Sequence, residues 1–212
     1  DADEAADCYR EVRTLREDDE ALAALLTHAR STDLHAELSE LLATRLGQPT
    51  SPEEAIELGM ERATLLLDHL GDPREAEREL LAIREREPKF APALARLGSL
   101  YLEEGNDEQL AEVTEAHLAL MTHPVQRAAL AKRLFGLYER AIPNAERALH
   151  AARHWAQAAP TELDALRALA DLLDPKTDAR ERMKALDARA DELTRLRAAG
   201  AGEDDAALRD EA

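Results

Sequence analysis

Two histidines one helical turn apart are the residues whose spacing most suggests chemistry. His150 and His154 stand in the stretch HAARH, and two imidazoles four positions apart on a helix can bind one metal ion together. A zinc site needs a third ligand, and the catalytic glutamate of the H-E-x-x-H motif is missing here. A metal-dependent hydrolase is therefore a remote alternative, and two surface or groove histidines are the simpler interpretation.

The rest of the sequence holds no arrangement typical of catalysis. It has no Ser, His and Asp spacing of a hydrolase, no glycine-rich phosphate loop and no Cys and His pair. Cys8 is the only cysteine, which excludes an internal disulfide and a cysteine-based zinc site. We therefore expect a protein that is not an enzyme and that uses no metal or cofactor.

Composition predicts an all-helical protein. Hydrophobic residues make up 45% of the chain but aromatic residues only 3%, so Ala and Leu must build the core, and both favour helices. No apolar run approaches the roughly 18 residues of a membrane span, and no charged-then-apolar leader opens the sequence. We expect a soluble protein with no membrane span. The sequence leaves the compartment unknown, with the cytoplasm slightly favoured.

The formal net charge of -18 argues against nucleic acid as a partner, because it repels phosphate backbones. A nucleic-acid role would need a strong local basic stripe to overcome this overall field. Acidic membrane surfaces are disfavoured for the same reason.

Signals for helix starts and ends divide the chain into short segments. N-caps are expected at Ser51, Asp72, Asn106 and Thr161, and exits through a left-handed residue at Gly47, Gly71, Gly105 and Gly200. Between these marks, apolar residues recur at helical spacing. We expect helices at 2–16, 19–30, 33–46, 53–70, 73–87, 91–104, 107–121, 125–141, 144–158, 161–173 and 178–197.

A pair of motifs recurs along the chain. LGSLY at 97–101 returns as LFGLY at 134–138 and LADLL at 169–173, and more faintly as ATLLL at 63–67. AEREL at 76–80 returns as AERAL at 145–149. Two helices per period of about 35 residues are typical of a helical solenoid.

These motifs resemble the tetratricopeptide repeat (TPR) family, whose helix pair follows W-x2-L-G-x2-Y, then A-x3-F, then P. Leu94, Leu97, Gly98 and Tyr101 match the first part with Leu in place of Trp, and Ala76, Leu80 and Pro88 match the rest. The resemblance implies an all-α, right-handed superhelical solenoid of antiparallel helix pairs. We expect a degenerate N-terminal helical region at 1–50, a TPR-like array at 51–197 and an acidic tail at 198–212.

The resemblance also implies a non-catalytic interaction module that binds a protein segment in a concave groove. Arg62, Arg96 and Arg133 stand immediately before successive copies of the LGSLY motif, with Lys132 and Arg167 beside the same register. None of Arg62, Arg96, Lys132 and Arg133 has an acid three or four positions away on its own helix. We therefore predict a basic stripe for an acidic segment, made of Arg62, Arg96, Ser99, Lys132, Arg133 and Arg167.

Two other interpretations of these charges stay open. Acids on neighbouring helices, or water, can supply the missing counter-charges. The carboxylate-clamp variety of the family pairs its basic residues with asparagines, whereas Ser99 and Gly136 hold those positions here, so a basic stripe is predicted and not that clamp. The acidic ends leave a further alternative, in which the chain is a structural segment of a larger helical array or self-associates end to end.

Overall fold

The computed structural model describes the backbone of residues 2–15 and 18–210, and the side chains of residues 3–12 and 18–199. The chain forms two compact units, Asp1–Glu104 and Gly105–Ala212, which are described separately. In the described part every regular element is a helix, and consecutive helices within each unit pack against each other. The predicted all-α class, with consecutive helices packed against each other, is confirmed.

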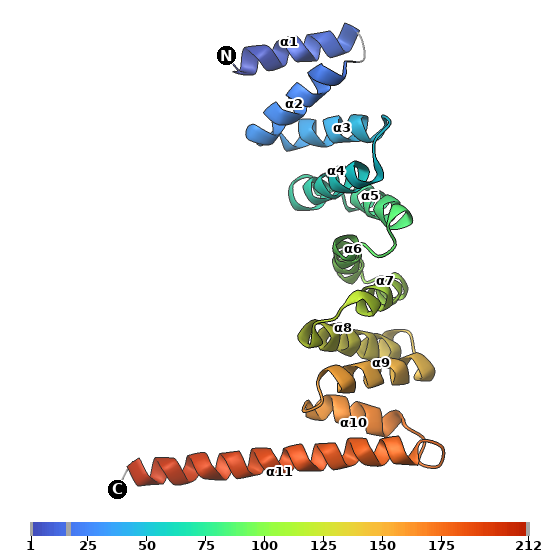
Figure 1. Cartoon of the computed structure of the whole chain (residues 1–212), viewed down its shortest axis with the longest axis vertical. Helices are drawn as coiled ribbons and strands as arrows, with labels where there is room; N and C mark the ends of the chain where they lie inside the picture. The colour runs from blue at the N-terminus through green and yellow to red at the C-terminus, as the bar shows by residue number, and fades with distance from the viewer. Residues whose placement is uncertain (1, 16–17, 211–212) are drawn as a thin grey trace. The chain divides into compact units, whose positions relative to one another are not determined.

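The first unit holds six α-helices and one π-helical turn among its described residues (Figure 1). From α1 to α5, each α-helix packs on the next one along the chain, and α3 also contacts η1. The elements are α1 (Ala2–Leu15), α2 (Asp19–Ser31), α3 (His35–Leu46), α4 (Pro52–Leu65), η1 (Leu66–Leu70), α5 (Pro73–Arg86) and α6 (Ala91–Glu104).

The second unit continues the same sequential packing, with a second π-helical turn after α8. Its last helix is the longest and extends past the end of α10, against which it packs (Figure 1). The elements are α7 (Asp107–Leu120), α8 (Pro124–Gly136), η2 (Leu137–Ala141), α9 (Ala145–Ala158), α10 (Leu163–Leu172) and α11 (Ala179–Asp210). No helix in the described chain is both long enough and apolar enough to cross a membrane.

Side-chain caps start the helices where the sequence predicts them in three of four cases. Ser51, Asp72 and Asn106 each accept a hydrogen bond from the backbone N–H three residues on. The prediction at Thr161 is wrong, because α10 is preceded by Glu162 at its N-cap. The Glu162 carboxylate makes no capping bond, since it accepts hydrogen bonds from two other side chains instead.

Glycines end two helices through the left-handed conformation. Gly71 has φ 66° and Gly105 has φ 69°, which only glycine adopts at little steric cost. Gly47 follows α3 as predicted but remains right-handed, with φ -74°. The predicted stop at Gly200 is wrong, because α11 continues to Asp210 through an alanine-rich stretch whose helix propensity offsets the roughly 1 kcal/mol cost of each glycine.

The repeated motif contributes buried side chains to the core of each unit. Leu97 and Tyr101 on α6 are almost fully enclosed, and so are their counterparts Leu134 and Tyr138 at the end of α8 and in η2. Both tyrosines donate a hydrogen bond to a glutamate of the preceding helix, Tyr101 to Glu77 at 2.8 Å and Tyr138 to Glu115 at 2.6 Å. Burial is the first cause that raises the pKa of each tyrosine, and the hydrogen bond adds to it.

The register expected for α9 is shifted. The match of AERAL to AEREL predicts that Ala145 occupies the buried position of Ala76, but Ala145 is exposed. Ala148, Ala152 and Trp155 are buried instead, so the apolar face begins three residues later than the sequence match places it. The helix begins at Ala145 because Asn144 accepts from the N–H of Arg147, and the packing face is set by the neighbours and not by the cap.

We expect Leu97→Ala to lower the free energy of unfolding by about 2–5 kcal/mol, because Leu97 is 0% exposed and its loss leaves a cavity. Leu102→Ala on the same helix is the matched control, since Leu102 is 51% exposed, and its effect should stay within about 0.5 kcal/mol. Urea unfolding followed by circular dichroism measures both, and equal losses would contradict the register.

Candidate protein-binding groove

Arg62, the first residue of the predicted stripe, is engaged within its own unit. Its side chain is 12% exposed and lies at the end of α4. The guanidinium donates to Glu79 and, at 3.1 Å, to Glu75, both on α5, and its Nε donates to the carbonyl of Ser39 on α3 at 3.2 Å. Arg62 therefore joins three helices, and the carboxylates of the neighbouring helix α5 neutralise its charge.

Arg96 and Ser99 lie on α6 of the same unit and are more accessible. Arg96 forms an exposed ion pair with Asp68 of η1, with nitrogen to oxygen distances of 3.1 and 3.3 Å. The Ser99 hydroxyl donates to the carbonyl of Ala95 one turn back on its own helix. Exposed pairs of this kind contribute about 0–1 kcal/mol, so the Arg96 guanidinium can exchange partners at little cost.

In the second unit Lys132 is held by an aromatic and carboxylate cluster. Its ammonium donates to Glu162 at 2.8 Å and lies 4.9 Å from the centre of the Trp155 ring. The indole N–H of Trp155 donates to the other oxygen of Glu162, also at 2.8 Å. The hydrogen bond from Lys132 is the main reason that the pKa of Glu162 lies below its usual value, and Trp155 lowers it further. The cluster ties α8, α9 and the start of α10 together.

This cluster forms one wall of a groove between α8 and α10. The groove has a volume of about 440 Å³, and Phe135 and Trp155 meet in it with ring centres 5.7 Å apart. Charged side chains of both signs line it together with these rings. The lining residues are Lys132, Phe135, Gly136, Glu139, Arg140, Trp155, Asp164, Arg167, Ala168, Asp171 and Leu172.

Two arginines at this groove have only loose partners. Arg167 is 59% exposed and lies 3.5 Å from Asp164 of its own helix, and Arg140 is 77% exposed and lies 3.8 Å from Glu139. The Arg140 guanidinium folds back against Gly136 at the end of α8, where a Cβ would lie 2.9 Å from Nη2 of Arg140. Both guanidinium groups are therefore near the groove and weakly bound.

The structure thus brings together part of the predicted stripe. Lys132 and Arg167 line one groove, whereas Arg133 is exposed on α8 and does not line it. Phe135, Arg140 and Trp155 were missed by sequence reasoning. Trp155 is the single tryptophan of the chain and follows HAARH directly. A lone large ring in an Ala-rich helix is the sequence signal that could have indicated a contact position.

The histidine pair lies in a different pocket of the second unit. His150 and His154 on α9 meet edge to face, with ring centres 4.6 Å apart, in a pocket of about 380 Å³ that Glu115 and Arg127 also line. Nη2 of Arg127 lies 3.1 Å from Nδ1 of His154, and its Nη1 donates to the carbonyl of Met121 at 2.9 Å. Within the described side chains, no group of three or more His, Cys, Asp or Glu residues is placed to hold a metal ion.

The geometry defines a class, an all-helical protein whose consecutive helices pack against one another within each unit. No protein-family model matches the sequence, and no curated protein matches it. Its structural neighbours are TPR proteins of low sequence identity. A crystal structure of MamA has 15% identity and a TM-score of 0.47, and the match covers 83% of this chain and 96% of that one.

Two further neighbours come from named organisms. A tetratricopeptide repeat protein from Parabacteroides merdae has 17% identity and a TM-score of 0.46, covering 84% of this chain and 63% of that one. TTC0263, a thermophilic TPR protein in Thermus thermophilus, has 22% identity and a TM-score of 0.37, covering 81% of this chain and 90% of that one.

The Arg127 and His154 contact predicts a pH dependence of stability. Burial, then His150 and Arg127, lower the pKa of His154 below its usual 6.5. A folded-state pKa below the unfolded value means that the contribution is present above about pH 6.5 and is lost as the pH falls through the lower folded value. We expect the free energy of unfolding to decrease between pH 7.5 and about 5.5 more in the wild type than in His154→Gln, which keeps an acceptor but does not titrate.

His123→Gln is the matched control, since His123 is exposed, and it should keep the wild-type pH dependence. His117 also has a lowered pKa through burial, so the difference between the two variants isolates His154. Identical pH profiles for wild type and His154→Gln, measured by urea unfolding, would show that the Arg127 contact does not depend on this proton.

Proposed function

We propose that this chain is a non-catalytic protein–protein interaction module that binds a protein segment in the groove between α8 and α10. The observation that carries the proposal is the joint presence, in one groove of about 440 Å³, of two packed rings and two weakly paired arginines. An apolar floor with a few convergent polar groups is typical of binding sites. The TPR-like fold, whose members usually scaffold protein interactions, supports the same conclusion.

The chemistry of the groove favours a segment that combines an apolar side chain with a carboxylate. Phe135 and Leu172 offer apolar surface, while Arg140 and Arg167 can donate hydrogen bonds to a carboxylate. The carboxylates now beside them lie at 3.8 and 3.5 Å, too far for good hydrogen bonds. A carboxylate of the bound segment, held by two hydrogen bonds from one guanidinium, would therefore displace only a weak interaction. Acidic side chains or a chain terminus on the segment would supply this carboxylate.

The six residues predicted from sequence take different parts in this proposal. Lys132 supports the groove wall, because Glu162 and Trp155 already engage its ammonium. Arg167 binds the segment. Arg133 is exposed on α8 and is a secondary contact of this unit. Arg96 and Ser99 belong to the first unit and stay a separate prediction there, whereas Arg62 pairs with Glu75, Glu79 and Ser39 and stabilises the fold.

Binding can be followed through Trp155, the single tryptophan, whose ring packs against Phe135 in the groove. The probes are short peptides with one Phe or Leu flanked by two Glu, and matched peptides with Lys in place of Glu. We expect the Glu peptides to change Trp155 emission and to bind more weakly as salt rises, because exposed charges are screened. Arg167→Glu should weaken binding about tenfold, since hydrogen bonds to charged groups contribute about 1.5–3 kcal/mol.

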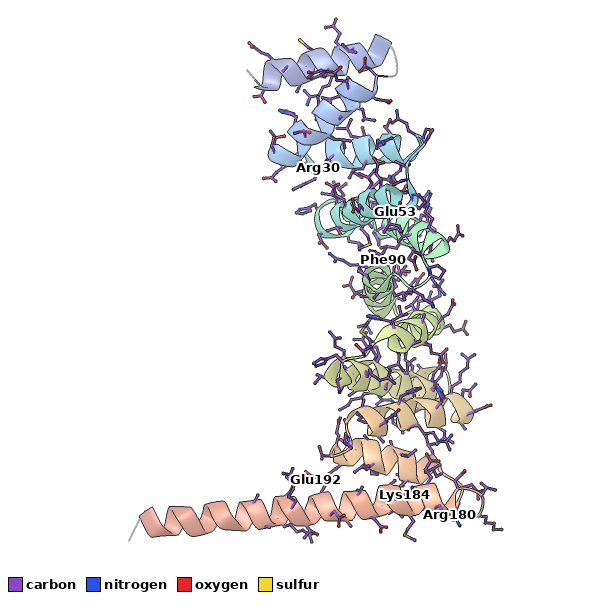
Figure 2. The ribbon with its side chains drawn as sticks, viewed as in Figure 1. Arg30, Glu53, Phe90, Arg180, Lys184 and Glu192 are labelled. Carbon is purple, nitrogen blue, oxygen red and sulfur yellow. The ribbon has the colours of Figure 1, made fainter. Side chains whose placement is uncertain are left out.

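Arg180→Glu is the matched control, because Arg180 is exposed on α11 and does not line the groove (Figure 2). Arg96→Glu tests separately whether the part of the predicted stripe in the first unit binds the same peptides. Equal affinity of wild type and Arg167→Glu for the Glu peptides at low salt, or equal binding of Glu and Lys peptides, would refute the groove as an acidic-segment site.

A further inference from the structure

The pocket that holds the two histidines combines nitrogen-bearing and apolar side chains that the proposed function does not use. It has a volume of about 380 Å³ and lies in the second unit, where α7 packs on α8 and α8 on α9 (Figure 1). Leu118 and Leu134, both buried, contribute apolar walls, and Ala119, which is exposed, also lines it. It shares no lining residue with the groove between α8 and α10.

Arg127 brings to this pocket a positive charge that no carboxylate neutralises. Its Nη1 donates to the carbonyl of Met121 at 2.9 Å, and its Nη2 lies 3.1 Å from Nδ1 of His154. A carbonyl and an unprotonated imidazole are both neutral. Among the side chains that the structure describes, Arg127 forms no ion pair, although the chain holds 45 acidic residues. Its charge is therefore available to an anion from outside the chain.

The contact with Arg127 determines which nitrogen of His154 carries the proton. A guanidinium donates and does not accept, so Nδ1 of His154 accepts, and the neutral imidazole carries its hydrogen on Nε2. Protonation of Nδ1 would place two donors and two positive charges 3.1 Å apart. An anion at this position accepts hydrogen bonds from both groups and offsets their repulsion.

His150 strengthens this effect. It lies one turn before His154 on α9, with the two ring centres 4.6 Å apart, and adds another positive charge when it is protonated. Burial is the first cause that lowers the pKa of His154, and His150 and Arg127 lower it further. A bound anion stabilises the protonated imidazole against all three causes. Anion binding and proton uptake therefore favour each other.

The acids near α9 are already held by other side chains. Glu115 of α7 lines the pocket, and its carboxylate accepts a hydrogen bond from Tyr138 of η2 at 2.6 Å. Glu162, at the start of α10, accepts from two side chains of α8 and α9. Glu181 of α11 pairs with Arg153. Protonated His154 would thus find its counter-charge in a ligand more readily than in these acids.

The apolar walls determine the kind of anion. Ligand pockets in proteins have volumes of about 300–1,000 Å³, so this one suits a small molecule. Leu118 and Leu134 favour a ligand that carries an apolar group beside its charge. Glu115 repels a second negative charge, which disfavours inorganic phosphate. A carboxylate on a small apolar group meets all of these conditions.

We propose that this pocket binds a small carboxylic acid as its anion and that binding is coupled to proton uptake by His154. The carboxylate accepts hydrogen bonds from Arg127 and from the protonated imidazole, and the apolar group packs on Leu118 and Leu134. Binding strengthens as the pH falls, by at most about tenfold per pH unit for one proton. The site is separate from the groove between α8 and α10 and takes a different class of ligand.

Calorimetry with phenylacetate at low salt tests the ligand and the coupling. We expect binding several times stronger at about pH 6 than at about pH 7.5. Heats measured in two buffers of different ionisation enthalpy should show that a proton is taken up. Phenylacetamide has nearly the same shape without the charge and should not bind, and inorganic phosphate should bind more weakly.

Variants test the role of each polar residue. Arg127→Gln should weaken binding about tenfold or more at both pH values, because hydrogen bonds to charged groups are strong. His154→Gln keeps an acceptor for Arg127 and should abolish both proton uptake and the pH dependence. Glu115→Gln still accepts from Tyr138 and should strengthen binding severalfold, because it removes the acid of the pocket. Arg133→Gln is the matched control, since Arg133 is exposed on α8 outside the pocket, and it should change nothing.

A steric variant places the ligand without changing any charge. Ala119→Phe fills the pocket from an exposed position and should prevent binding, whereas Ala129→Phe, exposed on α8 outside the pocket, should not. This pair keeps the test valid if Arg127→Gln does not fold, which circular dichroism would detect. Arg167→Glu should leave phenylacetate binding unchanged, because Arg167 lines the other groove.

Four outcomes would overturn the proposal. Unchanged affinity in Ala119→Phe, or in folded Arg127→Gln, would place the ligand outside the pocket. Binding without proton uptake would remove the role of His154. Tighter binding of inorganic phosphate than of phenylacetate would exclude a carboxylate as the ligand. Tighter binding of acetyl-Gly-Phe, whose carboxylate ends a peptide chain, would replace the small acid with a chain terminus.

Discussion

Close packing of helices that have almost no aromatic side chains is the constraint on which this structure depends. With 3% aromatic residues, each helix can bury enough surface only if neighbours approach it on more than one side. α9 shows the result, since it packs on both α8 and α10 and buries Ala148, Ala152 and Trp155. Small residues such as Gly98 and Ala76 permit the short distance between helix axes. Stability is therefore shared between consecutive helices, and no helix is independent of its neighbours.

The same packing determines which acidic side chains pair with the basic ones. Within each unit, several basic side chains reach an acid on the second helix along the chain. Arg10 of α1 binds Glu37 of α3, Arg30 of α2 binds Glu61 of α4, and Arg153 of α9 binds Glu181 of α11. These pairs are partly exposed and add little free energy each, but they restrict how alternate helices align.

Recognition depends on the charges and apolar residues that this internal pairing leaves over. Arg167 and Arg140 keep loose partners at the α8 and α10 groove, while Arg62 does not. The groove is thus a consequence of the same packing, because side chains are available to a partner where the neighbouring helices leave them weakly paired.

The sequence by itself determined which segments are helices, where most begin and end, and which leucines and tyrosines of the repeat are buried. Caps such as Ser51 and exits such as Gly71 act over a few residues, so their effect can be read locally. Only the tertiary structure decided that Glu162 accepts hydrogen bonds from Lys132 and Trp155 and does not cap its own helix. It also decided that α9 buries Ala148 in place of Ala145. In the same way, it decided that Arg62 is fully paired while Arg167 is weakly paired. These outcomes depend on which faces of neighbouring helices meet, and side chains far apart in sequence compete for the same partners there.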